Sequence, residues 1–383
     1  NMKLIIAGDF CPFKRTVELF QKGCFEDVLG DIKPILHSAD YSLVNLECPV
    51  INENSVVTPI PKCGPNLRTD MSAVEAIKYA GFKGVTLANN HILDYGECGL
   101  TDTITACRNK GLDVVGVGKN ILDAKRVLYK NVAQKCVAFI NCCEHEFSIA
   151  TEESSGANPM DPISQYYAIR EAKEQADFVI LIVHGGHEHY QLPSPRMKEW
   201  YRYFVDCGVD AVINHHQHCY SGYEIYKGKP IFYGIGNFCF DNENYRSGFW
   251  TQGFLVELDI KDSDIKFHLW PYIQCAEKPT IKLMDSRLEE LFMTHIKELN
   301  VAIANETQLK REYEKWAVAS SWGYKLALSP YSNRFLRAAA VRGLIPILLS
   351  KEKVLTMLNY VNCEAHRERL IYVLNKAIEK CSH

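Results

Sequence analysis

Residues that can bind a divalent cation recur at the ends of hydrophobic, strand-like runs in this sequence. Five such runs end in Asp9, in Glu47, in Asn90 with His91, in His184, and in His216 with His218. Because strand ends in an α/β sheet converge on one rim, residues far apart in the chain can meet in one site. Asp, Glu, Asn and His are ligands of hard or borderline divalent cations. The pattern therefore predicts a two-metal hydrolase site.

The histidines are concentrated in one part of the chain, since six of the 13 lie between His184 and His218. Two imidazoles spaced as in His216-x-His218 project to the same side of an extended segment, which suits two adjacent cations. Glu47 has two carboxylate oxygens and could bridge metals roughly 3.5–4 Å apart. A lone histidine at a strand end is more often a hydrogen-bonded core or loop residue. Only the combination with Glu47 and Asn90 favours a dinuclear centre.

A candidate acid–base pair follows Asn90. Asp94 lies three residues after His91 and could orient its ring toward a substrate, as in a general acid or base. The alternative is that Asp94 caps the helix expected to begin near Tyr95 and Gly96, and both roles are compatible.

Strand-like and helical patterns alternate through about residue 215. We expect a helical stretch at 14–36 and a strand at 41–47. A capping box formed by Ser72 and Glu75 predicts the start of another helix, which Gly81 ends. A further helix with one apolar face ends at Gly208; that face comprises Met197, Trp200, Tyr201, Phe204 and Val205.

The pattern changes after residue 220. Successive strand-like runs joined by short turns predict a meander. A parallel half followed by a meander indicates two sheets flanked by helices, an α/β fold. From about residue 284 strand character disappears, and 351–380 is expected to form one helix. We therefore divide the chain into a catalytic domain, 1–275, and a helical appendage, 284–383.

The bulk composition is that of an ordinary soluble globular protein, with 47% hydrophobic and 23% charged residues. A net charge of −3 gives no general attraction to nucleic acid or an anionic membrane. No stretch approaches the roughly 18–20 apolar residues that span a bilayer. The 15 cysteines include no CxxC pair and are interpreted as reduced core residues. We expect a cytoplasmic protein that binds an anionic small molecule or polymer and no nucleic acid.

Two segments outside the strand ends could also take part in binding. The proline-rich segment 48–69 directly follows Glu47 and is expected to be a long loop beside the site. Lys62 and Arg68 in this loop are candidates for holding an anionic substrate. Segment 334–349 mixes arginines with apolar residues, so it could lie on a membrane surface, on a partner or against the catalytic domain.

Taken together, the motifs point to one family. The chain contains LANNHILDYGECGLTDT, preceded by NLE and followed by HGGHE, HHQH and GIGNFCFD. In this order the motifs closely resemble the CapA-type poly-γ-glutamate capsule biosynthesis family, a branch similar to the calcineurin-like metallophosphoesterases. The resemblance covers about residues 3–260. It implies a two-sheet αββα sandwich of metallophosphoesterase type, with a C-terminal helical appendage that the resemblance does not cover.

The resemblance also implies roles for individual residues. The first metal would take Asp9, Glu47 and His218, and the second would take Glu47, Asn90, His184 and His216. His91 would act as general acid near the leaving group. Candidates for substrate contact are Asn45, Glu188, His187 and Asn237. His187 could equally be a solvated loop residue. Asn237 could instead support the structure, together with Gly236 and Asp241. Cys11 stands where the wider superfamily has a histidine ligand, and it could bind metal or be a buried hydrophobe.

The implied function is a metal-dependent hydrolase related to capsule biosynthesis, with two divalent cations, Mn, Fe or Zn. The ligand chemistry does not separate phosphoester from amide hydrolysis. The alternative is a non-catalytic component of a capsule-synthesis assembly that retains the fold. In either case a membrane-bound partner from capsule synthesis is conceivable, and the sequence predicts no oligomeric state.

Overall fold

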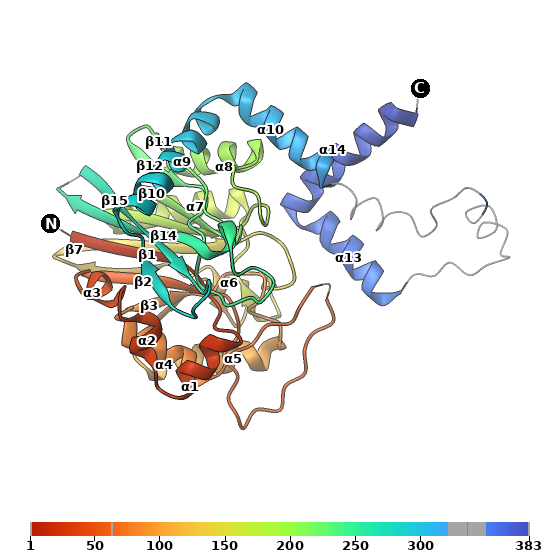
Figure 1. Cartoon of the computed structure of the whole chain (residues 1–383). Helices are drawn as coiled ribbons and strands as arrows, with labels where there is room; N and C mark the ends of the chain where they lie inside the picture. Colours follow the sequence, from red (N-terminus) through yellow and green to blue (C-terminus); the bar gives the residue numbers. More distant parts are fainter. Residues whose placement is uncertain (1, 63, 263, 321–334, 336–349, 382–383) are drawn as a thin grey trace.

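Two β-sheets packed face to face form the centre of the molecule, with helices on their outer sides (Figure 1). The computed structural model describes residues 2–62, 64–262, 264–320, 335 and 350–381. The predicted α/β two-sheet sandwich with helices at the C-terminal end is confirmed.

The first sheet has eight strands, with the parallel strands β1 to β4 at one side. Its order is β16-β15-β14-β1-β2-β3-β4, and β13 also pairs with β1. β1 to β4 are parallel, whereas β14, β15 and β16 continue the sheet in antiparallel fashion. The strands are β1 (Met2–Phe10), β2 (Tyr41–Leu46), β3 (Gly84–Thr86), β4 (Asp113–Val115), β13 (Asn237–Cys239), β14 (Gln252–Lys261), β15 (Asp264–Gln274) and β16 (Ile281–Leu283).

The second sheet has six strands in the order β11-β12-β10-β9-β7-β6, of which β7, β9, β10 and β12 are parallel. The strands are β6 (Leu128–Val132), β7 (Lys135–Cys143), β9 (Phe178–His184), β10 (Ala211–His215), β11 (Tyr223–Tyr226) and β12 (Lys229–Phe232). A separate two-stranded sheet pairs β5 (Val117–Gly118) with β8 (Gly156–Ala157).

The predicted meander after residue 220 is wrong in one respect, because its strands are divided between the two sheets. β11 and β12 extend the second sheet, and the chain then returns to pair β13 with β1 of the first. Gly236, with φ +79°, lies just before β13 and adopts the left-handed conformation that glycine tolerates best. Strand periodicity alone carries no information about which sheet a strand joins.

The inner faces of the two sheets make one hydrophobic core. Leu4, Ile6 and Leu43 of the first sheet belong to the same buried cluster as Ile180 and Val212 of the second. Burying each such side chain contributes about 1.5–3 kcal/mol. The central strands are apolar over most of their length, as expected for parallel strands covered on both faces.

Helices cover the outer faces of both sheets. The first sheet is covered by α1 (Arg15–Gln21), α2 (Phe25–Leu29), α3 (Lys33–His37), α4 (Met71–Ala80) and α5 (Gly96–Asn109). Against the second sheet pack α7 (Pro162–Gln175) and α8 (Pro195–Cys207). Two short elements lie in loops, α6 (Ile121–Ala124) and the 3-10 helix η1 (Gly248–Thr251).

The ends of one of these helices test the capping predictions. α4 is capped by Asp70, whose side chain accepts from the Ser72 amide at 2.9 Å, so the predicted capping box is wrong. Asp70 stands at the N-cap itself, and Glu75 instead pairs with Lys110. The predicted stop at Gly81 is confirmed by its left-handed conformation.

The C-terminal part is helical, as predicted, in α9 (Ser286–Ala304), α10 (Glu306–Ala319), α13 (Lys351–Asn362) and α14 (Glu364–Cys381). Phe292 and Ile296 of α9 are buried in the core that the two sheets share. The single helix predicted at 351–380 is two helices, because the chain is extended at Cys363. Of the segment 334–349, all but Phe335 lies outside the described residues. Among the helices that are described, none is both long and apolar enough to cross a membrane.

Candidate metal centre

The predicted ligand residues meet at one end of the sandwich. Asp9 lies next to the last residue of β1, Glu47 directly follows β2, and His184 ends β9. His216 and His218 follow β10, and Asn90 and His91 follow β3. Each of these seven residues is at most 7% exposed. The register explains the convergence, because Asp9 pairs with Asn45 of β2, and His184 pairs with His215 of β10.

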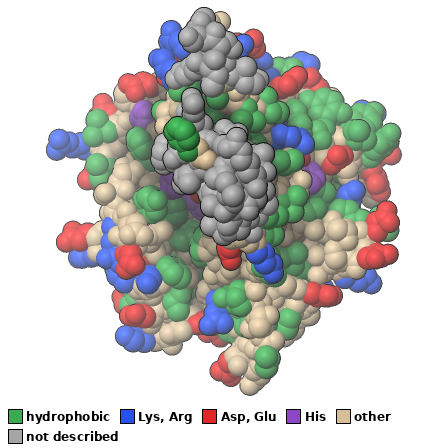
Figure 2. Space-filling view, turned by 90° about the vertical axis from the view of Figure 1, so that its right-hand side faces the viewer, with side chains coloured by type: hydrophobic (Ala, Val, Ile, Leu, Met, Phe, Trp, Pro, Cys, Tyr) green, Lys and Arg blue, Asp and Glu red, His purple; other side chains and the backbone are tan. Residues whose placement is uncertain are grey.

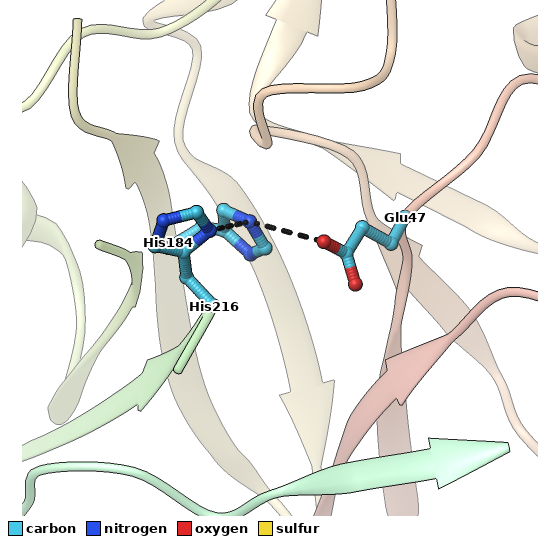
Figure 3. A group of neighbouring side chains, drawn as sticks. All are labelled: Glu47, His184 and His216. Atoms are coloured by element: carbon cyan, nitrogen blue, oxygen red, sulfur yellow. Dashed lines mark hydrogen bonds and ion pairs between the residues drawn. The ribbon is translucent and has the colours of Figure 1, made fainter. Parts of the chain in front are cut away.

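Glu47 is the centre of this cluster. Its carboxylate belongs to two groups of potential ligands, Glu47–His184–His216 and Asp9–Glu47–His218, within each of which the ligand atoms lie within 4.8 Å of one another. Figure 3 shows the rings of His184 and His216 facing Glu47 from the opposite sheet. Both carboxylate oxygens are buried and have no hydrogen-bond partner among the described residues. A buried carboxylate without donors is costly, and a bridging position between two cations would satisfy both oxygens.

Potential ligand atoms surround one nitrogen of His184. Its Nε2 lies 3.1 Å from Asn90 Oδ1, 3.1 Å from His216 Nδ1 and 3.6 Å from Glu47 Oε1. Burial, and then the positive charge of a protonated His216, lower the pKa of His184 well below its ordinary value. His184 is therefore held neutral, with a lone pair available to a cation. The four groups match the ligand set predicted for the second metal.

His218 faces Glu47 from the other side. Its Nε2 lies 3.7 Å from Glu47 Oε1, and its Nδ1 lies 2.9 Å from Asn237 Oδ1. Burial lowers the pKa of His218, so the neutral ring donates its Nδ1 hydrogen to Asn237. Asn45 similarly donates to Asp9 Oδ1 at 2.7 Å. Asn237 and Asn45 are 0% and 1% exposed, and each contacts a candidate ligand, so both are placed to orient those side chains.

The pKa values of Glu47 and His216 are both raised in the absence of a cation. Burial, and then the negative charge of Asp9, raise the pKa of Glu47 well above its ordinary value. Although burial opposes protonation of His216, the charges of Glu146 and Glu188 raise its pKa. A nearby divalent cation would reverse both tendencies, because it favours the carboxylate and the neutral imidazole.

The backbone at the two histidines after β10 is strained. His216 has φ +94° and His218 has φ +54°, both in the left-handed region. Such residues cost about 1–3 kcal/mol each and cluster at functional sites. The His216 amide also donates to Asp9 Oδ2 at 3.2 Å, which fixes the loop against β1. The strain is therefore associated with bringing both imidazoles to the carboxylates.

His91 and Asp94 form the predicted pair. His91 Nδ1 lies 2.7 Å from Asp94 Oδ2. Asp94 does not cap the following helix, because Tyr95 is the N-cap of α5, so that alternative is wrong. Lys62, from the proline-rich segment, forms an ion pair with Asp94 and lies 3.0 Å from His91 Nδ1. Its side chain is only 2% exposed, so Lys62 is a buried part of this group.

Two further residues named in the sequence analysis, Cys11 and Asp241, lie in surroundings of their own. Cys11 belongs to neither ligand group of Glu47. Burial, and then the Cys48 side chain, raise the pKa of Cys11 well above its ordinary value, in keeping with a neutral buried thiol. Asp241 is a structural residue that binds Arg15 through both carboxylate oxygens, at 2.8 and 2.9 Å.

The 13 cysteines with described side chains are all free thiols.

His187 and Glu188, the two substrate-contact candidates that follow His184, lie in different surroundings. His187 packs against the C-terminal helices, with its ring 5.0 Å from Trp316 and its Nε2 3.8 Å from Glu368. The structure does not bring His187 to the Glu47 cluster. Glu188 is exposed. Although desolvation opposes ionisation, the charges of His218 and His216 lower its pKa.

Glu146 is a member of the site that the sequence analysis missed. Its Oε2 accepts from Asn90 Nδ2 at 2.9 Å, which turns Asn90 Oδ1 toward His184. Although burial opposes ionisation, the hydrogen bond from His366 and the charge of His216 lower the pKa of Glu146. The residue follows the end of β7, so the strand-end rule applied to a sixth strand would have found it.

The end of the sandwich at which β1 ends is also the end nearest α13 and α14 (Figure 1). Figure 2 views the molecule from this side. Over the described part of that face, acidic and basic side chains are interspersed rather than gathered in one patch.

The two sheets and their covering helices define an α/β two-sheet sandwich, and the candidate ligands lie at the strand ends on one of its edges. The family model of bacterial capsule synthesis proteins, PGA_cap, matches residues 3–242. This chain therefore belongs to the PGA_cap family of bacterial capsule synthesis proteins.

Known proteins show how far the similarity extends. The chain is 32% identical to the capsule biosynthesis protein CapA of Bacillus anthracis over 69% of this chain and 65% of that protein. It is 33% identical to the PGA biosynthesis protein CapA of Bacillus subtilis over 58% of each chain. The chain thus spans less than two thirds of the length of either relative. A phosphatase crystal structure from Mycoplasma pneumoniae aligns with 17% identity and a TM-score of 0.46. The alignment covers 76% of this chain and 96% of that one. A similarity of this size carries no information about activity.

Proposed function

We propose that this protein is a metal-dependent hydrolase related to capsule biosynthesis, with two divalent cations bridged by Glu47. The observation that carries the proposal is the buried carboxylate of Glu47, whose oxygens have no hydrogen-bond partner among the described residues and which belongs to two groups of potential ligands. When bound, two such cations, Mn, Fe or Zn, supply Lewis-acid activation of the scissile group and of the attacking water.

Two sets of residues that share Glu47 would hold the two cations. Asp9, Glu47 and His218 make the first site. Glu47, Asn90, His184 and His216 make the second. Asn45, Asn237 and Glu146 each hold one ligand by a hydrogen bond. Carboxylate, amide and imidazole together suit Mn, Fe and Zn, so the ligand set leaves the choice among them open.

His91 is the proposed general acid. With Nδ1 bound to Asp94, the other ring nitrogen carries the proton that the leaving group takes. Asp94 holds the ring through this contact, and Lys62 forms an ion pair with the same carboxylate.

The proposed substrate is a phosphoester or amide in an anionic capsular polymer or its precursor. The class follows from the family and from the names of the Bacillus relatives, one of which is a PGA biosynthesis protein. Delivery of a polymer would require a membrane-bound partner from the same synthesis machinery. Glu188, exposed beside the histidines, is the proposed residue that meets the substrate.

The test is hydrolysis of p-nitrophenyl phosphate and of a γ-linked glutamyl peptide by protein loaded with Mn, Fe or Zn. We expect His91→Ala to lower turnover of the accepted substrate by about 10²–10⁴-fold. His268→Ala removes an exposed histidine that packs on Trp270 and is the matched control. Full metal loading without turnover of either substrate would contradict a hydrolase and favour a non-catalytic assembly component.

A further inference from the structure

A third group of ligand side chains lies beside the dinuclear centre, where α13 meets α14. Glu146, Cys363 and His366 each offer a ligand atom, and these atoms lie within 4.8 Å of one another. Glu146 Oε1 lies 3.4 Å from His366 Nε2 and 3.9 Å from Cys363 Sγ. Cys363 and His366 lie beyond the residues that the family model matches.

The chemistry of this group is that of a zinc ligand set. Cysteine, histidine and glutamate are all zinc ligands, and three protein ligands leave a fourth position open. Tetrahedral ligands with normal zinc bond lengths stand roughly 3.3–3.7 Å apart, close to the 3.4 and 3.9 Å that separate Glu146 from His366 and from Cys363. We propose that Glu146, Cys363 and His366 form a third cation site, selective for Zn²⁺ or a similar borderline cation.

The surroundings of Cys363 separate this proposal from a simpler interpretation. Without a cation, Glu146 and His366 would form an ion pair and Cys363 would be a buried hydrophobic residue. However, Cys363 is only 1% exposed, and its sulfur lies 3.6 Å from Glu144 Oε2 as well as 3.9 Å from Glu146. Both contacts are hydrogen bonds that the thiol can donate, so Cys363 is a polar member of this group rather than a hydrophobic residue, and its sulfur lies beside the carboxylate and imidazole that would complete a cation site.

Ion pairs around the site hold the loop after β7 and helix α14 next to each other. His145 Nδ1 lies 2.5 Å from Glu364 Oε1, which joins the loop after β7 to the start of α14. Arg196 of α8 bonds both Glu144, at 2.5 Å, and Glu368 of α14, at 3.3 Å. The three proposed ligands are thus positioned by contacts that do not depend on them.

The third site shares a residue with the dinuclear centre. Glu146 uses Oε1 toward Cys363 and His366, and Oε2 toward Asn90. A cation there would therefore fix α13 and α14 beside the centre and hold Glu146 in place for Asn90. The site is additional to the proposed hydrolytic centre and does not require hydrolysis to occur.

Cobalt substitution in the full chain tests for the thiolate directly. Co²⁺-loaded wild-type protein should show a thiolate-to-cobalt charge-transfer absorption, because Cys363 supplies sulfur. We expect Cys363→Ser to abolish this band and Cys11→Ser, the matched control, to retain it. Absence of the band in the wild type would overturn the proposal, as would its loss in Cys11→Ser instead.

Zinc content provides the second measurement and remains valid if one variant folds poorly. His366→Gln should reduce bound zinc by about one ion per chain while the two ions of the dinuclear centre remain. Cys219→Ser, at another buried free thiol, should leave zinc content unchanged. Unchanged zinc in both His366→Gln and Cys363→Ser would overturn the third site. If the protein had no dinuclear centre, the wild type would lack the two ions proposed to bind there. It would still bind the one zinc ion that His366→Gln removes, so the two failures are distinguishable.

Discussion

His218 donates its Nδ1 hydrogen to Oδ1 of Asn237 across 2.9 Å, and this bond leaves Nε2 of the ring facing Glu47. The orientation of the Asn237 amide is itself fixed, because its Nδ2 donates to the Trp250 carbonyl at 3.2 Å and to the His218 carbonyl at 3.4 Å. Asn237 therefore sets which nitrogen of His218 is available to a cation.

Asn237→Ala should weaken binding at the first metal site. Loss of the hydrogen bond to a ligating histidine costs about 10–100-fold in metal affinity or activity. Calorimetric titration of the metal-free protein measures the change. Asn214→Ala is the matched control, since Asn214 is equally buried but, within the described part of the chain, its side chain bonds two backbone carbonyls and Tyr201. Equal affinity in Asn237→Ala and the wild type would show that this bond does not orient a ligand.

Asp94→Asn should reduce turnover without loss of metal. The neutral amide of this variant could not stabilise a protonated His91 as the carboxylate does, so we expect kcat to fall about 10–100-fold and KM to change little. Steady-state kinetics with metal analysis separates the two effects. Asp210→Asn removes another buried carboxylate, bound by Lys173 and Lys229 away from the site, and should lower stability only. A normal kcat in Asp94→Asn would contradict the role of His91.

Glu47→Gln should have opposite effects on stability with and without metal. In the presence of a chelator, replacing a buried carboxyl group whose oxygens have no hydrogen-bond partner among the described residues should stabilise the protein by about 1–3 kcal/mol. With saturating Mn²⁺ the variant should be less stable than the wild type, because it loses ligand-linked stabilisation. Thermal unfolding under both conditions measures the two differences. The same sign under both conditions would show that Glu47 does not bind a cation.

The cysteines should differ sharply in reactivity. Cys98 is exposed, whereas burial raises the pKa of Cys107 to about 12. At about pH 8 the buried thiol of Cys107 stays protonated and out of reach of the reagent, so iodoacetamide should label the exposed Cys98 and spare Cys107 in the folded protein. Mass spectrometry of digested samples identifies the labelled residues.

The same shift has a consequence at high pH. Because the pKa of Cys107 is raised above its ordinary value of 9.0, its contribution to stability is present below pH 9.0 and is lost as the pH rises toward about 12. Cys107→Ala should lessen that loss. Labelling of Cys107 as fast as Cys98 would contradict its burial.

The strand-end pattern predicted most of the centre because it follows from topology. Asp9, Glu47 and His184 end or follow parallel strands, and such ends must meet at one edge of the sandwich. The same reasoning did not distinguish a ligand from the residue that orients it. Asn45 and Asn237 have ligand-like side chains, and only their contacts show that they lie behind Asp9 and His218.

Other features depend on contacts that no local pattern encodes. Glu146 meets Cys363 across 217 positions of the sequence, so the third group arises only when α14 docks beside β7. The capping prediction failed because Asp70 precedes Ser72 and accepts from its amide. The division of the later strands between two sheets likewise depends on the turn at Gly236.

Electron paramagnetic resonance of Mn²⁺-loaded protein tests the bridging role of Glu47 most directly. Two manganese ions that share the Glu47 carboxylate should be spin-coupled and give an exchange-coupled spectrum in the wild type. In Glu47→Gln we expect that spectrum to disappear, leaving weaker binding of isolated ions. A wild-type spectrum of uncoupled Mn²⁺, or a coupled spectrum that survives in Glu47→Gln, would contradict a dinuclear centre bridged by this residue.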